Sequence, residues 1–589
     1  MYYYIVNHSN CSIYNQVIIK KVIIFSLFAA AVLLFTNCGG VSKMVDNANL
    51  VKYTVTPDPL QTHGGKVAVA VEVKYPAKYF HKKAIVKATP YLKYEAGQTD
   101  LKSESLQGEA VTENFKVISN ASGGTFSYSD EVAYAPEMMR SELWVRSEAS
   151  VGSTKVDLPA RKIADGIVTT PLLVCKEARP IMFNDNFKRI VPESYQADIH
   201  YVINKSDVRT SELKQDDIVG MKDFINKANA DERTTLKGID ISAYASPDGP
   251  VDLNTKLSGA REGTATDYVK KELKQSKVEL PADKEFFKLM ATPEDWDGFR
   301  DLMVNSNIKD KDLILRVLAM YSDPVVREKE IRNISAAFEQ IKTDILPQLR
   351  RSKMVVNIEK VGYSDEELKQ LVTTNLDVLN LEELLYAATL VDDLNTKLTV
   401  YEKAAAKFPQ CVRAHNNVGY VQVKLGNASA AKAAFDKAKA LKEANIINNN
   451  LGCVAMMDGD LTKAEELFTA ALGAGDEVNY NLGILKILAG DYEAAQNYYG
   501  NTASFNSALV KLLNGNPSAC YEMLRDLEDE CAKVYYLMAV SMARGGDTER
   551  MYNALSTCVA KDASWKQYAV KDVEFYKFWE EQMFKETVK

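Results

Sequence analysis

The first long stretch of the chain shows a hydrophobic pattern typical of β-strands. Between residues 48 and 185, short runs of alternating apolar and polar residues are separated by Gly, Asn, Asp and Pro. The run from Lys66 to Tyr75 places four valines on one face, and this period of two is characteristic of a half-buried strand. Short strands at regular spacing predict a β-sandwich over residues 48–185, of the kind with turns every 8–12 residues.

The second stretch, residues 195–362, alternates strand and helix patterns. "YQADIHYVINKS" and "LKGIDISAYAS" have the alternation of strands, and each is followed by a run with apolar residues at helical spacing. A long helical pattern over 280–345 then separates these elements from a last strand, Lys353 to Val361. The order βαβ, helical insert, β predicts an α/β sandwich with a single layer of helices.

The third stretch, residues 376–589, is helical and repeats itself. Asn-Val-Gly or Asn-Leu-Gly recurs at Asn417, Asn450 and Asn481, at intervals of 33 and 31 residues, and a Gly-Asn or Gly-Asp turn follows each. A period near 34 with two helices per unit is the tetratricopeptide repeat pattern. About six units predict an all-α solenoid whose concave groove binds a protein or peptide partner.

The first 37 residues have the pattern of a secretory signal. Two lysines precede a 14-residue apolar run, Val22 to Phe35, which is shorter than the about 20 residues that span a bilayer. The end of the run resembles a bacterial lipoprotein signal. This resemblance implies acylation of Cys38, a polar tether over residues 38–47, and an outer-membrane, periplasm-facing location. An uncleaved signal anchor is the alternative.

Composition argues against several function classes. A net charge of -7 and a pI near 5.6 give no support for nucleic-acid binding, which normally shows as a basic domain. The six cysteines after Cys38 contain no CxxC pair and fit buried apolar positions. The four remaining histidines lack ligand spacing, so neither a metal nor a cofactor is expected. No catalytic or nucleotide-binding motif is present, so we predict no enzyme activity.

The architecture expected from these patterns is therefore multidomain. It consists of an immunoglobulin-like β-sandwich, an α/β domain with a helical insert, and a tetratricopeptide solenoid.

One motif of the α/β domain resembles a known family. "ISAYASPDG" leads into a helix with the spacing N-x-x-L-S-x-x-R, which the OmpA-like peptidoglycan-binding domain shares; Glu262 stands where that family has Ala. The resemblance covers about residues 195–275 and 346–361. The residues that match are Asn254, Leu257, Ser258 and Arg261.

The resemblance implies a site for a peptidoglycan stem peptide. Arg261 would bind the diaminopimelate carboxylate bidentately, with Asn254 beside it, and an acid would bind the ammonium. Ser246 holds the usual place of that acid, and Asp248 is the only carboxylate in the turn. Either Asp248 does the acid's work or the site has lost its affinity. The alternative roles are an ion pair for Arg261, a turn position for Asp248 and a cap for Asn254.

Two functions follow from these patterns. The first is a non-catalytic outer-membrane lipoprotein that tethers the envelope to peptidoglycan and scaffolds a protein partner or assembly through its repeats. The alternative is a pure protein-interaction scaffold whose OmpA-like domain no longer binds peptidoglycan. An enzyme, such as a wall hydrolase, lacks any nucleophile–base or metal constellation.

Overall fold

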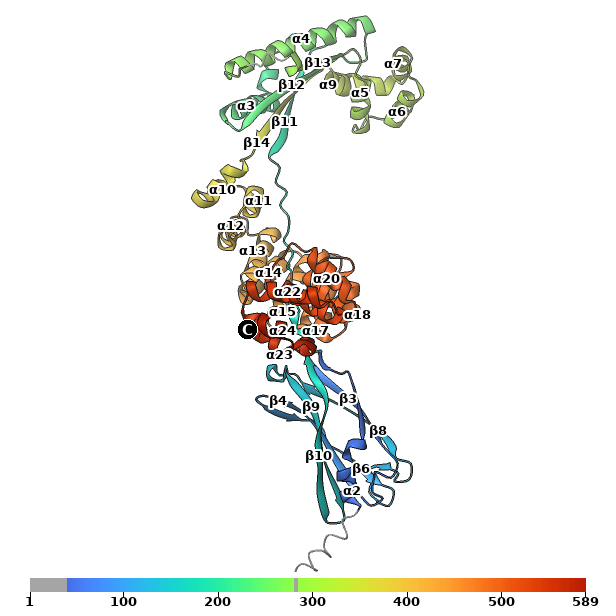
Figure 1. Ribbon diagram of the computed structural model, residues 1–589. Helices are drawn as coiled ribbons and strands as arrows, with labels where there is room; N and C mark the ends of the chain where they lie inside the picture. Colours follow the sequence, from blue (N-terminus) through green and yellow to red (C-terminus); the bar gives the residue numbers. More distant parts are fainter. Residues whose placement is uncertain (1–39, 280–283) are drawn as a thin grey trace, which may run out of the picture. The chain divides into compact units, whose positions relative to one another are not determined.

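The structure is a computed structural model that describes residues 40–279 and 284–589 (Figure 1). The expected signal segment and Cys38 lie outside the described residues. The chain forms two compact units. The first combines residues up to Phe183 with His415–Lys589, and the second is Asn184–Ala414.

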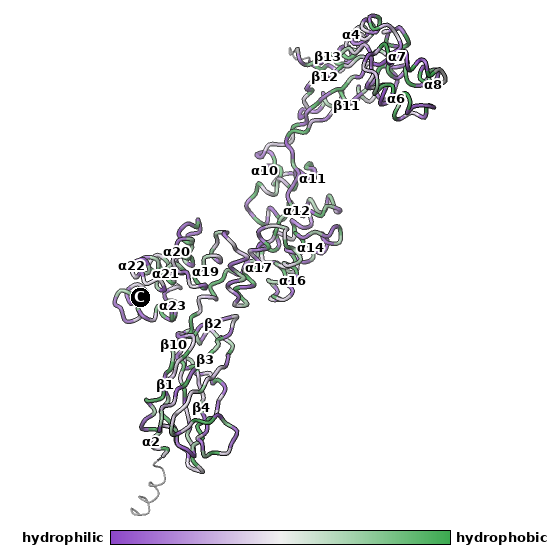
Figure 2. The backbone as a smooth tube through the Cα atoms, turned by 90° about the vertical axis from the view of Figure 1, so that its right-hand side faces the viewer, coloured by the Kyte–Doolittle hydropathy of each residue, from purple (hydrophilic) through white to green (hydrophobic). Residues whose placement is uncertain are grey.

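The N-terminal part of the first unit is β-rich, as the alternating pattern predicts. The sheet order is β1-β3-β2-β10-β9-β4-β6-β7, with β5 on β4 and β8 on β3. All four valines of β3 are buried in the core of this β domain, and Figure 2 shows both green and purple positions along the strands of the domain. The strands are β1 (Lys52–Thr56), β2 (Leu60–His63), β3 (Lys66–Tyr75), β4 (Ile85–Tyr94), β5 (Gly97–Asp100), β6 (Glu104–Gly108), β7 (Lys116–Ile118), β8 (Gly124–Ala133), β9 (Ser141–Val151) and β10 (Thr154–Val168).

The polar tether expected over residues 38–47 differs from the structure in its described part. Helix α2 (Val41–Asp46) forms there, and its Val41 and Met44 are buried in the core of the β domain. The two apolar side chains are three residues apart, so they lie on one face of the helix. Because both side chains reach the core, α2 is part of the folded β domain and not of a free linker.

The second unit contains the α/β domain in the predicted order. Helices α3 and α4 share one apolar core with the sheet, which fits the single helix layer that the sequence predicts. The sheet order is β11-β14-β12-β13; β14 is antiparallel to both of its neighbours. Its elements are β11 (Ile190–His200), α3 (Asp216–Ala230), β12 (Thr234–Tyr244), α4 (Val251–Gln275), β13 (Phe287–Thr292) and β14 (Arg351–Val361).

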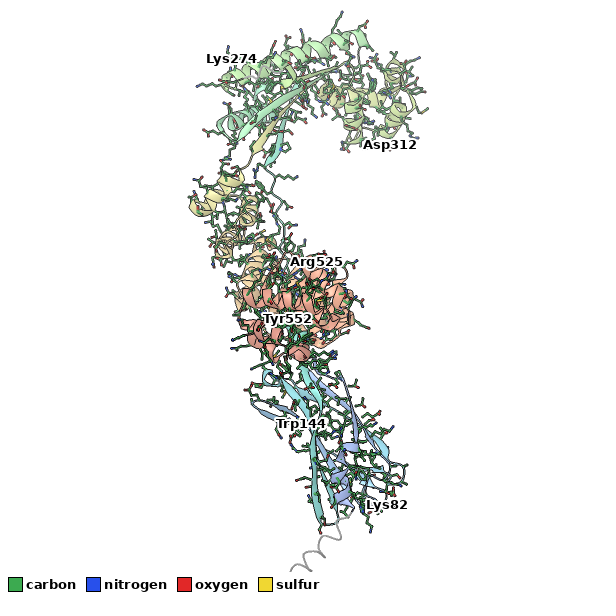
Figure 3. All side chains as sticks on the ribbon, in the orientation of Figure 1. Lys82, Trp144, Lys274, Asp312, Arg525 and Tyr552 are labelled. Carbon is green, nitrogen blue, oxygen red and sulfur yellow. The ribbon has the colours of Figure 1, made fainter. Side chains whose placement is uncertain are left out.

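The insert expected to be helical over 280–345 contains a strand in its described part. β13 pairs in parallel with β12, and its adjacent Leu289 and Met290 are both exposed, so the period of two is missing from its sequence. The insert helices that follow have a small core of their own, and Asp312 marks α6 in Figure 3. These helices are α5 (Trp296–Val304), α6 (Lys311–Met320), α7 (Pro324–Asn333), α8 (Ser335–Gln340) and α9 (Leu346–Leu349).

The rest of the chain is a series of helix pairs, as the repeat pattern predicts. Helices α10–α12 belong to the second unit, and the pairs after His415 belong to the first. The helices are α10 (Asp365–Thr374), α11 (Leu381–Thr389), α12 (Leu394–Lys407), α13 (Val412–Lys424), α14 (Ala428–Leu441), α15 (Asn445–Met457), α16 (Leu461–Ala470), α17 (Asp476–Ala489), α18 (Tyr492–Tyr499), α19 (Phe505–Leu513), α20 (Pro517–Arg525), α21 (Ala532–Gly545), α22 (Thr548–Lys561), α23 (Ser564–Lys571) and α24 (Gln582–Thr587).

The recurring glycine of each Asn-x-Gly motif is explained by close packing within a repeat. A Cβ on Gly452 would lie 2.6 Å from the ring of Phe468, and one on Gly483 would lie 2.5 Å from the ring of Tyr499. These distances are shorter than a van der Waals contact, so only glycine lets the aromatic side chain of the next helix fill this place.

Candidate functional site

Arg261, the first residue of the predicted peptidoglycan site, is 1% exposed. Its Nε donates to the carbonyl of Lys205 at 3.0 Å, and its Nη1 donates to the carbonyl of Tyr244 at 2.8 Å. The guanidinium also lies 5.1 Å from the ring centroid of Tyr201. Burial lowers the pKa of Arg261 to about 10. The side chain therefore ties the end of β12 to a neighbouring loop.

Asp248 pairs with an arginine that the sequence did not single out. Arg350 Nη2 lies 3.2 Å from Asp248 Oδ2, and Arg350 Nε donates to Ser246 Oγ at 3.1 Å. Ser246 in turn donates to the other oxygen of Asp248. Arg332 Nη2 donates to the main-chain carbonyl of Asp248 at 2.9 Å. The carboxylate thus already has a positive partner inside the domain.

Asn254 closes the turn between β12 and α4. Its Nδ2 donates to the carbonyls of Ser246 at 3.2 Å and Gly249 at 3.0 Å, and the residue is 4% exposed. The structure therefore places the three predicted residues around the end of β12. Their side chains hydrogen-bond to groups of the same domain. Arg350 was missed because it lies in the segment between α9 and β14, about 100 residues from the turn.

A second site lies in the first unit, where the chain leaves the β domain. After β10 and the short helix η3 (Thr170–Leu173), residues 174–183 run along the repeats without regular secondary structure of their own. We call residues 174–183 the strap. It can be followed in Figure 1 as the teal segment that leaves β10 and enters the helical repeats.

Four asparagines hold the strap by its main chain, and we call them the asparagine ladder. Each Oδ1 accepts from the N–H of one strap residue, and each Nδ2 donates to the carbonyl of the same residue. The two distances are 2.9 and 2.9 Å for Asn417 with Phe183, 2.7 and 2.7 Å for Asn450 with Ile181, 2.7 and 2.9 Å for Asn481 with Arg179, and 2.8 and 2.8 Å for Asn506 with Cys175.

Two further asparagines connect the ladder into a network. Asn416 and Asn449 each precede a ladder residue, and their Nδ2 atoms donate to the carbonyls of Ile181 at 3.2 Å and Arg179 at 3.1 Å. Their Oδ1 atoms accept from the ladder residue of the next repeat, both at 2.9 Å. All six asparagines are at most 1% exposed, so their amides bond mainly to the strap and to one another; Asn506 Nδ2 also donates to Tyr480 OH at 3.2 Å.

Apolar and aromatic contacts support the strap along its length. Val174 is buried in the core of the last repeats, and Ile181 packs on the core around Phe468. The guanidinium of Arg179 lies 3.5 Å from the ring centroid of Tyr480. These contacts add burial to the main-chain hydrogen bonds.

Most asparagines of the ladder recur visibly in the sequence, but there their recurrence indicated only the repeat. Asn417, Asn450 and Asn481 are the asparagines of the Asn-x-Gly motifs. Buried polar groups in proteins are nearly always hydrogen-bonded. An amide that recurs at the same buried position of successive repeats therefore indicates a polar ligand along the groove. Asn506 lacks the glycine of the motif and could not be found from it.

The residues after the strap contact the second unit's own helices. The N–H of Asn186 donates to Glu382 Oε2 at 2.7 Å, and the ring of Phe187 stacks on Tyr386 with centroids 4.5 Å apart. Glu382 also pairs with Arg413. The connection between the β domain and β11 is thus bound to helices within each unit.

The exit of the β domain also contacts the C-terminal helices. Thr170 Oγ1 donates to Glu574, which pairs with Arg544. Asp572 accepts from Tyr536 OH at 2.6 Å and is 1% exposed. Burial, with the nearby Glu574 charge, raises the pKa of Asp572 to about 7.

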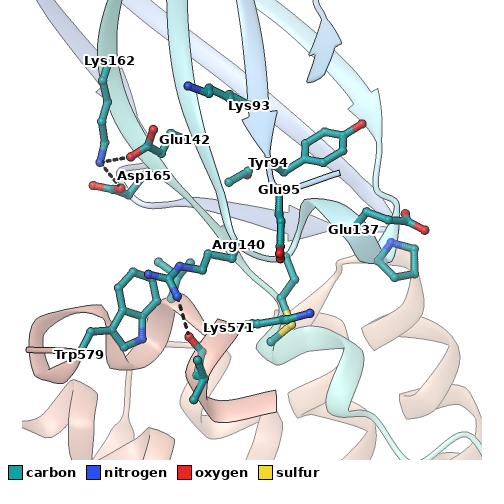
Figure 4. A pocket seen from close by; sticks show the side chains of 15 residues that line it. Lys93, Tyr94, Glu95, Glu137, Arg140, Glu142, Lys162, Asp165, Lys571 and Trp579 are labelled. Atoms are coloured by element: carbon teal, nitrogen blue, oxygen red, sulfur yellow. Dashed lines mark hydrogen bonds and ion pairs between the residues drawn. The ribbon is translucent and has the colours of Figure 1, made fainter. Parts of the chain in front are cut away.

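An open cavity of about 740 Å³ lies beside this junction. Figure 4 shows Arg140 next to Trp579, with the guanidinium 4.0 Å from the ring centroid, and Lys162 between Glu142 and Asp165. Both positive and negative side chains line the cavity, so its charge favours no single ligand class.

The described residues contain neither a cluster of metal-ligating side chains nor a membrane-spanning helix. Across 40–279 and 284–589, no three His, Cys, Asp or Glu side chains gather closely enough to hold a metal ion. In the same ranges, no helix has both the length and the apolar character needed to cross a membrane.

Comparisons with known proteins identify the helical repeats. Residues 412–445 match the family model of the tetratricopeptide repeat. None of the curated proteins matches the chain.

Similar solved structures include a tetratricopeptide repeat protein from Parabacteroides merdae, with 15% identity, 38% of this chain and 91% of that chain covered, and a TM-score of 0.27. PilF of Pseudomonas aeruginosa has 14% identity, covers 36% of this chain and 97% of its own, and has a TM-score of 0.28. These likenesses are too distant to carry an argument about function. The family model, together with the helix pairs, shows that the C-terminal part of the chain contains tetratricopeptide repeats.

Proposed function

We propose that this chain is a non-catalytic scaffold of a bacterial cell envelope, in which the tetratricopeptide repeats organise extended protein segments. The asparagine ladder carries this proposal, because it binds four residues of the ten-residue strap by main-chain hydrogen bonds. The groove expected from the sequence thus holds a peptide segment, and that segment belongs to the same chain. An external protein partner then contacts repeat surfaces outside the ladder.

Photo-crosslinking in cells tests the scaffold function. A crosslinking amino acid at Leu461, which is 42% exposed at the start of α16, should capture a protein partner. The same amino acid at the strap residue Arg179 should give mainly crosslinks within the chain. Absence of any partner crosslink from a scan of exposed repeat positions would contradict the proposal.

The envelope location rests on the sequence. The 14-residue apolar run and Cys38 support a lipid anchor in the outer membrane, with the domains facing the periplasm. Labelling with a fatty-acid analogue should mark the wild type and leave Cys38→Ser unlabelled. Equal labelling of both proteins, or none of the wild type, would remove the lipid anchor from the proposal.

Peptidoglycan binding by the α/β domain is a second candidate. The three arginines Arg261, Arg350 and Arg332 favour it, since they lie around a turn that itself contains only the acid Asp248. Arg332 also pairs with Glu328, so the positive charge is partly neutralised inside the domain. Such a site suits a carboxylate. The pairing of Asp248 with Arg350 weighs against it, because the diaminopimelate ammonium needs a free acid. The geometry therefore favours the pure scaffold over the wall tether.

Cosedimentation with purified sacculi separates the two candidates. The scaffold function predicts that residues 39–589 stay in the supernatant. Wall binding predicts that they pellet and that Asp248→Ala and Arg332→Ala weaken pelleting. Arg261→Ala is a poor test here, because that side chain holds two main-chain carbonyls inside the domain.

A further inference from the structure

We propose that the asparagine ladder is a binding site for extended polypeptide main chain, and that the strap is its resident, non-covalently bound ligand. On this account the β domain stays attached to the repeats after the covalent connection beyond the strap is cut. The inference rests on the proposed scaffold function and names the partner of the groove.

The ladder recognises main-chain groups and no common side chain. Its four strap residues are Cys175, Arg179, Ile181 and Phe183, which differ in size, charge and polarity. Every rung makes the same two bonds, one to the N–H and one to the carbonyl of a single residue. A site of this kind selects for an extended backbone with free hydrogen-bonding groups along one edge.

The spacing of the rungs matches the repeat of an extended chain. In such a chain, residues two apart direct their main-chain groups to the same edge and advance about 6.6 Å. Arg179, Ile181 and Phe183 are two apart, and each contacts the asparagine of a successive repeat. One tetratricopeptide unit therefore binds two residues of ligand.

The ladder skips one strap position between Cys175 and Arg179. Asn481 and Asn506 are separated by a short unit whose helix α18 has eight residues. Over the same interval the strap advances from Arg179 to Cys175 and passes Glu177 without an asparagine contact. The first and second halves of the strap are thus bound with different spacing.

The single proline of the strap falls where the site tolerates it. Pro180 lacks an N–H and lies between the rung residues Arg179 and Ile181, so its main chain faces away from the ladder. A proline at a rung residue would remove one of the two ladder bonds. The position of Pro180 therefore fits a site that binds the N–H of every second residue.

The buried amides explain why the strap remains in place. Leaving a buried donor or acceptor unsatisfied costs about 1–3 kcal/mol, and all six asparagines are at most 1% exposed. Departure of the strap would strand several such groups at once. The groove is therefore closed to foreign peptides in the resting protein, which is why external partners bind elsewhere.

The test uses the full chain with a protease recognition site inserted between Asn184 and Asp185, where Asn184 is exposed. After cleavage without denaturant, size-exclusion chromatography should show both fragments in one peak. Separation of the wild-type fragments would overturn the proposal.

Proline variants distinguish the ladder from the other contacts of the β domain. Arg179→Pro removes the N–H that Asn481 binds, while Glu177→Pro introduces the same ring two residues away, at an exposed position whose N–H the ladder does not reach. Arg179→Ala separates the loss of the side chain over Tyr480 from the loss of the N–H. We expect about tenfold faster fragment dissociation for Arg179→Pro than for Arg179→Ala, equivalent to about 1.4 kcal/mol, and little change for Glu177→Pro. Equal effects of Arg179→Pro and Arg179→Ala would contradict main-chain recognition.

The result of the cleavage experiment does not depend on whether the scaffold function is correct. If the cleaved fragments stay together but no partner crosslinks to the repeats, the scaffold function fails and the ladder assignment stands.

Discussion

The asparagine ladder is a fully buried polar network and the turn around Asp248 a partly buried one, and the two use their hydrogen bonds differently. The ladder has neutral amides that bind a segment from another part of the chain. The turn has charged groups that bind one another and nearby carbonyls of their own domain. The comparison teaches that the residues of the motif resemblance hydrogen-bond within their own domain, whereas the asparagines that mark the repeats bind a segment from elsewhere in the chain.

Loss of one ladder asparagine should have the largest effect. Asn450→Ala leaves the N–H of Ile181 without its partner and weakens the bonding of the carbonyl, so we expect a loss of about 2–4 kcal/mol in the free energy of unfolding. Urea denaturation measures it. Asn445→Ala, on an exposed position of the same helix, is the matched control and should change stability by less than about 0.5 kcal/mol. Equal losses for both variants would show that the strap contributes nothing.

A glycine comparison tests the packing behind the ladder. Gly483→Ala places a Cβ 2.5 Å from the ring of Tyr499, so we expect a loss of about 1–3 kcal/mol from overpacking. Gly259→Ala in α4 meets no atom within 4 Å and should be neutral or stabilising by up to about 1 kcal/mol. The melting temperature should therefore fall for Gly483→Ala and stay unchanged or rise for Gly259→Ala. A loss at Gly259 equal to that at Gly483 would contradict this packing.

The ion pair of the turn should contribute less than a ladder rung. Asp248→Asn removes the charge that faces Arg350 and keeps the size of the side chain. We expect a loss of about 1 kcal/mol, since both groups are partly accessible, at 9% and 17% side-chain exposure. The loss should shrink at high salt, whereas the Asn450→Ala loss should not. A salt-independent loss for Asp248→Asn would show that the pair acts through packing alone.

The pH dependence of stability should come from the C-terminal junction and not from the ladder, because amides do not titrate. Burial raises the pKa of Asp572 from 3.8 to about 7, so the folded state binds its proton more tightly than the unfolded state. This contribution is fully present below about pH 4 and is lost as the pH rises to about 7. Asp572→Asn should flatten the stability profile between these values. An unchanged slope in the variant would assign the dependence to other groups.

The sequence predicted the parts of the fold that follow a regular period. The alternating valines of β3, the βαβ order and the repeat interval each reflect a local pattern that the structure retains. Strand β13 was missed because its apolar pair Leu289-Met290 does not alternate. The strap was missed because residues 174–183 have no period of their own, and their conformation is set by asparagines more than 230 residues away.

The sequence predicted which residues lie near the candidate site of the α/β domain, but not which groups those residues bind. The sequence shows a strand, a turn and a helix one after another. This order predicted that Asp248, Asn254 and Arg261 lie near the end of β12. Their partners did not, because Arg350 and Lys205 are distant in the chain. Whether an arginine faces solvent or a carbonyl depends on those distant groups.

Hydrogen exchange of individual strap amides tests the central claim most directly. Main-chain binding by the ladder predicts slow exchange at Cys175, Arg179, Ile181 and Phe183 and faster exchange at Lys176 and Ala178, whose N–H groups the ladder does not reach. Hydrogen-exchange mass spectrometry with fragmentation of the peptides to single-residue resolution would reveal this alternation. Uniformly fast exchange along residues 174–183 would contradict the claim that the strap is bound in the groove.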